Sequence, residues 1–469
     1  MDTVEADRSA PVTPGNRVRP SIGLREAVAI IVGVVIGAGI FKSPSIVAGL
    51  SGSAVQMFGL WIMGGVVSLI GALCYAELTT AYPHPGGDYH YLQRAFGRSV
   101  SFLFGWARFS VITTGSIALL AFVFGDYMQQ AVPLTPLPGA WGGTAYALAV
   151  IVCLSALNLR GIRAGAGAQT WLTATEVLGL LLIVGAAALY SDPAPVTAST
   201  APAAAGADAG NITASLGMAM VFVLLTYGGW NEAAYISAEM RTGPRGMVLA
   251  LTLGIAIITA LYLLVTWAYW KVLGMDGMAA SDAVAADVMR RAFGPVGGKL
   301  ISVLVAVSAL TSINATMIVG ARTGYAMGCD WAPLRRMADW DGERGTPTVA
   351  MLVQCGAALV LVGVGAALGS GFKAMVEFTA PVFWLFFLLA GVSLLVLRRR
   401  EPNTPRPFRV PLYPVLPLLF CASCAYMLVS SLSYVSSQTL GGLNAAWIGV
   451  AVLACGAVLL LLLRSRGKS

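Results

Sequence analysis

Long apolar segments, separated by short polar stretches, follow one another along the whole 469-residue chain. Apolar runs of about 18 residues or more are typical of transmembrane helices, because about 20 residues span the hydrocarbon core of a bilayer. Twelve segments are predicted, at 27–48, 55–81, 101–131, 145–159, 169–190, 212–237, 247–270, 296–327, 349–368, 374–397, 416–434 and 446–463. We therefore expect an all-α membrane protein with twelve transmembrane helices.

Composition and charge support this class. Hydrophobic residues make up 57% of the chain and charged residues 11%, whereas soluble proteins carry about 25% charged residues. Most lysines and arginines fall in tails and loops of one side, which predicts a multi-pass protein of the cytoplasmic (inner) membrane with both termini in the cytoplasm. The net charge of +8 therefore reflects topology. We expect the lipid bilayer, and no nucleic acid, as a partner.

Two spans contain glycine-rich breaks near their middle. "VIGAGIFKSP" (35–44) interrupts the first span and "TYGGWN" (226–231) the sixth. In lipid, an unwound backbone is tolerated only where it lines a cavity or is buried in protein. Glycines that merely allow close helix packing are the alternative. Discontinuous helices 1 and 6, five spans apart, favour a secondary transporter built from two inverted halves.

This symmetry predicts the domain organisation. A cytoplasmic N-terminal tail is expected first, followed by a first inverted repeat, an external linker, a second inverted repeat, and two further helices with a cytoplasmic tail. The corresponding residues are 1–24, 25–190, 191–211, 212–397 and 398–469. The charged stretch 274–295 is expected to form one external helix within the second repeat.

The two breaks suit a zwitterionic ligand. A half-helix that starts after Gly39 offers backbone N–H groups and the positive end of its dipole to a carboxylate. The carbonyl groups that end the preceding half-helix at Ile36, and those freed at 225–228, suit an ammonium group. An α-amino acid carries both charges a short distance apart, so amino acids are the expected substrate class.

Four motifs carry a family resemblance. They are "GVVIGAGIFKSP" (33–44), "PGGDYHYLQRAFG" (85–97), "YGGWNEAAYISAEM" (227–240) and "RPFRVPLYPVLP" (406–417). They resemble the amino acid–polyamine–organocation superfamily, particularly L-type amino acid transporters and their prokaryotic relatives. The resemblance implies the leucine-transporter-like fold, a five-plus-five inverted repeat, and alternating access. Together with the breaks, it gives a candidate substrate site at Ile36, Gly37, Ala38, Gly39, Ile40, Leu225, Tyr227, Gly228, Asn231 and Tyr269.

The resemblance also raises the question of gating. Leu225 stands where L-type relatives carry an aromatic gate, so Phe222 or Trp230 are the alternative gate candidates. Lys42 is a further gate candidate. It lies inside the first span and is expected either to face the cavity or to be paired; a misplaced span boundary is the other possibility. The external cysteine that attaches a heavy chain in animal members is absent, so no covalent partner is expected.

Glu176 is a candidate coupling residue, because ionisable side chains within spans are functional candidates. It is expected either to carry a coupling proton, or to ligate a cation such as sodium with the carbonyls of Gly33 and Ile36 and the hydroxyls of Ser308 and Ser312. A neutral, hydrogen-bonded glutamic acid is the alternative. Other charges near the spans, among them Glu77 and Arg108, are expected at solvated helix ends; ion pairs of a cytoplasmic gate are the alternative.

The predicted function is therefore secondary active transport of amino acids, most readily neutral L-amino acids, by exchange or by proton-coupled symport. A sensor that uses the same pocket without net flux is the alternative. No cofactor or metal is expected. The chain contains two histidines, and no nucleophile–base or metal-ligand pattern favours an enzyme.

Overall fold

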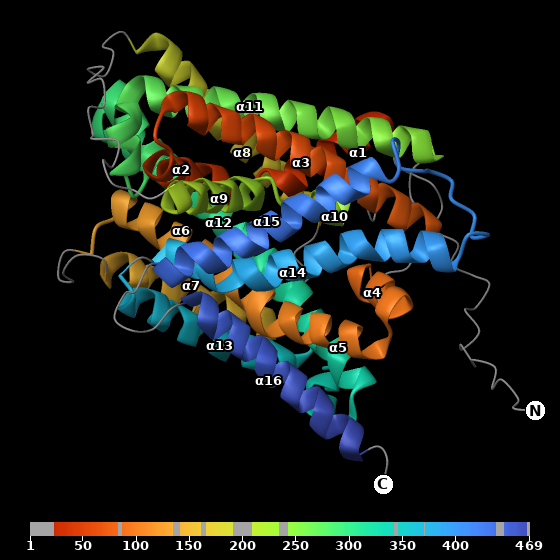
Figure 1. The fold of residues 1–469 in the computed structure, drawn as a ribbon. Helices are drawn as coiled ribbons and strands as arrows, with labels where there is room; N and C mark the ends of the chain where they lie inside the picture. Colours follow the sequence, from red (N-terminus) through yellow and green to blue (C-terminus); the bar gives the residue numbers. More distant parts are fainter. Residues whose placement is uncertain are drawn as a thin grey trace, which may run out of the picture.

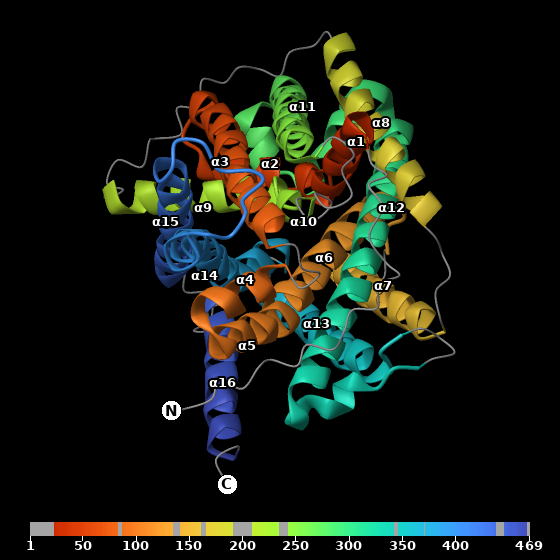
Figure 2. The same ribbon diagram turned by 90° about the vertical axis from the view of Figure 1, so that its right-hand side faces the viewer.

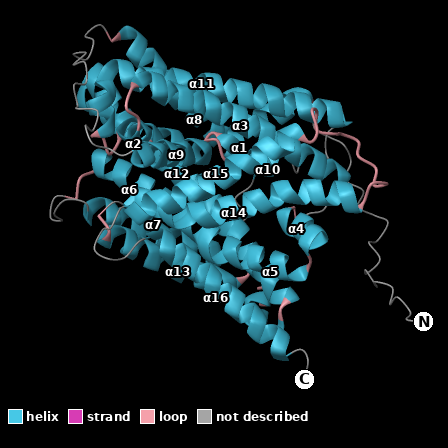
Figure 3. Ribbon diagram, viewed as in Figure 1, coloured by secondary structure: helices cyan, strands magenta, loops and turns pink. Residues whose placement is uncertain are grey.

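The computed structural model describes residues 23–82, 87–134, 141–160, 166–190, 209–233, 243–341, 346–369, 371–437 and 445–466. Within these ranges the regular structure is helical, apart from an isolated bridge between Asp341 and Thr346. Figures 1 and 3 show a bundle of long helices. The all-α prediction is confirmed for the described part of the chain.

Each of the twelve predicted apolar segments overlaps one or more helices. The first half of the chain forms α1 (Leu24–Val35), α2 (Ser43–Leu50), α3 (Ala54–Ala81), α4 (Asp88–Phe96), α5 (Arg98–Ala107), α6 (Thr114–Ala131), α7 (Trp141–Leu159) and α8 (Ala166–Leu189). The second half forms α9 (Ala209–Thr226), α10 (Trp230–Ala233), α11 (Gly243–Ala279), α12 (Val284–Asp330), α13 (Thr348–Ala367), α14 (Gly371–Arg400), α15 (Val415–Ser437) and α16 (Ala445–Arg466). Short elements between them are η1 (Ala38–Phe41), the π-helical turn η2 (Arg108–Thr113) and η4 (Ala332–Ala338).

Eight helical stretches in the described residues are long and apolar enough to cross a membrane. They are Ala54–Ala81, Arg98–Ala131, Trp141–Leu159, Arg245–Ala279, Val284–Asp330, Thr348–Ala367, Gly371–Arg400 and Val415–Ser433. Shorter apolar helices lie at Glu176–Leu189, Ser215–Thr226 and Trp447–Leu462. These lengths support a multi-pass membrane protein, while the total of twelve spans stays a prediction.

The stretch 274–295 does not form the single external helix that its periodicity predicts. Gly274 (φ 71°) interrupts α11, Gly294 (φ 68°) interrupts α12, and residues 281–283 between the two helices are not helical. Positive φ values of this size are readily adopted by glycine and rarely by other residues. The prediction of a single helix is wrong because the chain turns at Gly274 and Gly294, where the apolar periodicity of the sequence continues without a break.

Small residues on α3 bring it close to the segment around 226–231. A Cβ atom on Gly64 would lie 2.4 Å from Cγ1 of Val223, and one on Gly71 would lie 2.6 Å from the Trp230 ring. Trp230 meets Tyr75 edge to face, with 5.3 Å between the ring centroids. Close helix approach at small residues is typical of membrane bundles. It holds α3 directly against α9 and α10.

Glu77, near the end of α3, is buried rather than solvated. Both of its carboxylate oxygens accept hydrogen bonds from Arg398 at the end of α14. The backbone N–H of Val410 donates to Glu77 at 2.7 Å, and Arg406 Nε lies 3.5 Å from its Oε1. The expectation of a solvated helix end is wrong because the segment after α14 folds back over this carboxylate. The observed contact is an ion pair, as in the alternative, and a gating role for it stays a prediction.

A second, more exposed ion pair ties the same segment to α4. Arg94 Nε donates to Glu401 Oε1 at 2.7 Å. This hydrogen bond holds the pKa of the Glu401 carboxyl below its usual value. The pair is therefore ionised at neutral pH, and it offers an exposed counterpart to the buried Glu77 cluster.

Replacing Glu77→Gln should lower the free energy of unfolding by ~3–5 kcal/mol, because it leaves buried arginines without their carboxylate. The matched change Glu401→Gln breaks the more exposed ion pair with Arg94 and should cost less than ~1 kcal/mol. Thermal unfolding of the purified variants in one detergent measures both. Equal destabilisation by the two changes would contradict the buried-pair assignment.

Candidate functional site

The first apolar segment is interrupted between α1 and α2. α1 ends at Val35, and Ile36 (φ −70°, ψ 116°) and Gly37 (φ −146°, ψ −172°) are extended. The four-residue turn η1 and then α2 follow. A helix that ends leaves backbone carbonyl groups unpaired, and a helix that begins leaves N–H groups unpaired. Apart from Gly37 and its two chain neighbours, no atom of the described residues lies within 4 Å of the position that a Cβ on Gly37 would take, so open space adjoins this break.

A second interruption separates α9 from α10. α9 ends at Thr226, and residues 227–229 form a turn in which Gly229 has a φ of 103°. The two interruptions are in contact, because a Cβ on Gly39 would lie 3.4 Å from the Cα and side chain of Thr226. Segments almost two hundred residues apart in the chain therefore meet.

Tyr262 on α11 joins the two helix ends. Its hydroxyl oxygen lies 3.1 Å from the carbonyl oxygen of Val35 and 3.1 Å from that of Thr226. Tyr262 thus offers its proton to both carbonyl groups at the ends of α1 and α9. The sequence analysis missed this residue. The signal that could have found it is a tyrosine in the middle of an apolar span, since tyrosines of spans are enriched at the membrane interfaces.

The aromatic residues of the predicted site are buried in different contacts. Tyr227 donates its hydroxyl hydrogen bond to the Trp61 carbonyl at 3.0 Å. Phe222 stacks on Phe372, with ring centroids 6.2 Å apart. Tyr269 is fully buried, and its hydroxyl has no hydrogen-bond partner among the described residues. The remaining predicted residues near the breaks are buried or half-buried: Ile36, Ala38, Ile40, Leu225 and Gly228.

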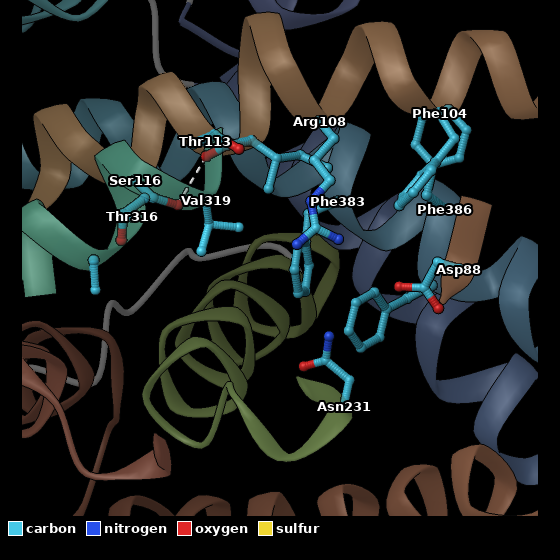
Figure 4. Close-up of a pocket in the computed structure, with 13 residues that line it drawn as sticks. Asp88, Phe104, Arg108, Thr113, Ser116, Asn231, Thr316, Val319, Phe383 and Phe386 are labelled. Atoms are coloured by element: carbon cyan, nitrogen blue, oxygen red, sulfur yellow. Dashed lines mark hydrogen bonds between the residues drawn. The ribbon is translucent and has the colours of Figure 1, made fainter. Parts of the chain in front are cut away.

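A cavity of about 230 Å³ adjoins α10. Figure 4 shows the Arg108 side chain, from η2, directed toward Asn231 of α10, with Asp88 at another part of the wall. Arg108 was expected at a solvated helix end; it lines this cavity instead. The lining residues are Asp88, Phe104, Arg108, Ile112, Thr113, Ser116, Asn231, Ala315, Thr316, Val319, Phe383, Phe386 and Phe387. Asn231 is the one residue of the predicted substrate set among them.

Lys42 is held by polar groups at the far end of the first interruption. Its Nζ donates to Asp126 Oδ2 at 2.7 Å and to the Asp282 carbonyl at 2.6 Å. Nearby, Tyr127 donates to the Phe41 carbonyl at 2.6 Å. These contacts tie η1 and α2 to α6 and to the turn before α12. In Figure 1, α2 lies toward one end of the bundle and α4, which bears the cavity residue Asp88, toward the other.

Glu176 on α8 is buried and accepts a hydrogen bond from the Ser308 hydroxyl on α12. No hydrogen bond joins it to Gly33 or Ser312 in the described part of the chain. The described part of the chain contains no group of three histidine, cysteine or carboxylate side chains placed to hold a metal ion. The contact observed is thus a glutamate–serine pair between two helices.

The helix lengths and the paired interruptions define a multi-pass α-helical membrane protein. The family model "Amino acid permease" matches residues 22–456. The chain belongs to the amino acid permease family. This confirms the predicted resemblance to the amino acid–polyamine–organocation superfamily.

Characterised relatives cover most of the chain. The serine/threonine exchanger SteT of Bacillus subtilis is 27% identical over 90% of this chain and 93% of its own length. The human Asc-type amino acid transporter 1 is 28% identical, over 93% of this chain and 81% of its own. The human b(0,+)-type amino acid transporter 1 is 28% identical, over 87% and 82%.

The Lys42–Asp126 pair makes a prediction for a double-mutant cycle. Lys42→Met and Asp126→Asn should each destabilise the protein, and the double variant should recover part of the loss, with a coupling of ~1–3 kcal/mol. The control cycle uses the exposed pair Asp287–Arg290, 2.8 Å apart, with Asp287→Asn and Arg290→Gln and an expected coupling below ~1 kcal/mol. Unfolding in one detergent measures both cycles. Additive effects of Lys42→Met and Asp126→Asn would rule out the coupling.

Proposed function

We propose that this protein carries amino acids, most readily neutral L-amino acids, across the cytoplasmic membrane as a secondary active transporter that works by alternating access. Membership of the amino acid permease family supports this proposal. So do relatives named as a serine/threonine exchanger and as amino acid transporters. Exchange and proton-coupled symport are the two modes considered.

The observation that carries the proposal is the contact between the two helix interruptions. In the proposed site, the substrate carboxylate lies against the backbone N–H groups of 37–40, in the open space beside Gly37. The ammonium group lies near the carbonyl groups of Ile36 and of 225–228. Asn231 and Tyr269 complete the proposed site. Asn231 lines the cavity of about 230 Å³ beside α10, and Tyr269 has a buried hydroxyl without a hydrogen-bond partner in the described residues.

The proposed architecture has twelve spans in two inverted repeats, 25–190 and 212–397, with discontinuous helices 1 and 6 and both termini in the cytoplasm. Eight long and three shorter apolar helices, together with the interrupted first segment, support this count. The proposal requires no covalently attached partner subunit.

In the proposed cycle, Lys42 closes the external side of the site. Its contacts with Asp126 and Asp282 connect the second half of helix 1 to α6 and to the turn before α12. Opening this side separates Lys42 from these partners. Phe222 and Trp230 supply aromatic bulk around the sixth span, where they pack against Phe372 and Tyr75. They are the proposed aromatic gates in place of Leu225.

Counterflow in proteoliposomes tests the function. Internal serine, threonine, alanine or leucine should stimulate uptake of the same labelled amino acid by at least about fivefold for substrates that are exchanged. Uptake without internal substrate, driven by an imposed pH gradient, would indicate symport. Failure of a broad panel of amino acids under both conditions, with protein that remains folded, would reject the proposal.

Gly37→Ala tests the site. The added methyl group enters open space and the extended backbone accepts any residue, so folding should be unaffected while the half-saturation concentration rises about tenfold or more. Gly356→Ala on α13 is the control and should transport normally, because its methyl group also meets nothing within 4 Å among the described residues outside its own stretch of helix. Normal transport by Gly37→Ala would remove this backbone from the site.

Glu176 is proposed as the coupling group, either as a proton carrier or as a cation ligand together with Ser308, Ser312 and the Gly33 carbonyl. The buried contact between Glu176 and Ser308 supports this role. Proton carriage is the simpler alternative, since a buried carboxyl group can exchange a proton without further ligands.

Glu176→Gln should abolish the dependence of uptake on an imposed gradient while exchange continues. Uptake is measured with a pH gradient and, separately, with a sodium gradient, so the two forms of coupling are distinguished. Glu377→Gln, which changes another buried carboxyl group in a span, is the control. Unchanged gradient dependence in Glu176→Gln would exclude both coupling roles.

A further inference from the structure

A second cavity, of about 630 Å³, lies where α14 ends and α15 begins. Its wall combines apolar side chains, among them Leu395, Val396 and Leu418, with Arg398, Arg399 and Tyr413. Figure 2 looks onto this end of the bundle, where the segment that joins α14 to α15 lies at the front. The cavity is thus at the end of a membrane span, with apolar walls on the side of the span and cationic groups at its end.

The two arginines of the cavity have different surroundings. Arg398 is engaged by Glu77, and its guanidinium lies 3.8 Å from the centroid of the Tyr413 ring. Arg399 is exposed and makes no hydrogen bond or ion pair with any described residue. One cationic group of the wall is therefore neutralised within the protein, while the other faces the cavity without a carboxylate partner among those residues.

The turn before α15 and the start of α15 carry exposed apolar side chains. Leu412 is 72% exposed, Val415 53% and Leu418 51%. Leu412 also has a φ of 51°, a left-handed conformation that is uncommon for a leucine. Aromatic and long cationic side chains next to exposed apolar ones are typical of the interface between hydrocarbon and head groups. The turn 411–414 and the start of α15 thus present a surface suited to lipid.

We propose that this cavity binds an anionic phospholipid. The phosphate of this lipid contacts the Arg399 guanidinium, and one of its acyl chains lies along Leu395, Val396 and Leu418. Basic pockets at the ends of transmembrane helices are suited to anionic head groups, and guanidinium groups match the geometry of phosphate oxygens. The site lies at the connection of α14 to α15 and is independent of the amino acid that the protein carries.

Lipid retention tests the ionic half of the site. The full chain is equilibrated in nanodiscs of equal parts phosphatidylglycerol and phosphatidylcholine, then extracted mildly, and bound lipid is counted by native mass spectrometry. The protein should retain one phosphatidylglycerol in preference to phosphatidylcholine, and Arg399→Gln should lower this retention about fivefold. Arg409→Gln, an exposed arginine of the same segment outside the cavity wall, should retain lipid normally.

A second pair of variants tests the apolar half. Leu418 and Leu419 are both 51% exposed, but only Leu418 lines the cavity. Leu418→Ser should weaken retention of phosphatidylglycerol, and Leu419→Ser should not. Soluble glycerol phosphate, which has the anionic group without acyl chains, should not displace the lipid. Equal losses in Arg399→Gln and Arg409→Gln, equal losses in both leucine variants, or displacement by glycerol phosphate would each overturn the proposal.

Discussion

The structure depends on satisfying backbone polar groups where helices stop inside an apolar bundle. An unsatisfied carbonyl or N–H group away from water costs several kcal/mol, on the order of the net stability of many proteins. Here the Tyr262 hydroxyl group donates to the carbonyl groups of Val35 and Thr226, and the Tyr127 hydroxyl group donates to that of Phe41. These hydroxyl groups allow two helices to end near each other within the bundle. The open space beside Gly37 exists because its backbone does not have to continue a helix.

Charged side chains obey the same constraint. Lys42 lies among an aspartate and a carbonyl group, and Glu77 lies among two arginines and a backbone N–H. Both clusters connect segments far apart in the sequence, one at each end of the bundle. A buried charge that is well paired holds its helices in one arrangement, and its separation requires water or a new partner. In the proposed alternating-access cycle, such clusters would hold the protein in one of its states.

Several features of the fold were predictable from local patterns. Lengths of apolar segments predicted the helices, because a span must be long enough to cross the bilayer. Paired glycines at 37–39 and 228–229 lie directly after the ends of α1 and α9, while the discontinuous first and sixth spans stay a prediction. The stretch 274–295 misled the prediction, since its helical periodicity continues through the turns at Gly274 and Gly294. The periodicity of apolar residues indicates which face of a helix is apolar. It does not indicate where the chain changes direction.

By itself, the sequence determined the class of protein and the family resemblance, because these depend on residues close together in the chain. Only the tertiary structure decided which polar groups meet. Lys42 and Asp126 are 84 residues apart, Tyr262 and Val35 are 227, and Arg398 and Glu77 are 321. Arg108 likewise became a cavity residue only because the fold places η2 and α10 in the wall of one cavity. The physical reason is that the residues next to a charge or hydroxyl group in the sequence do not specify its partner. The partner depends on how distant helices pack against one another.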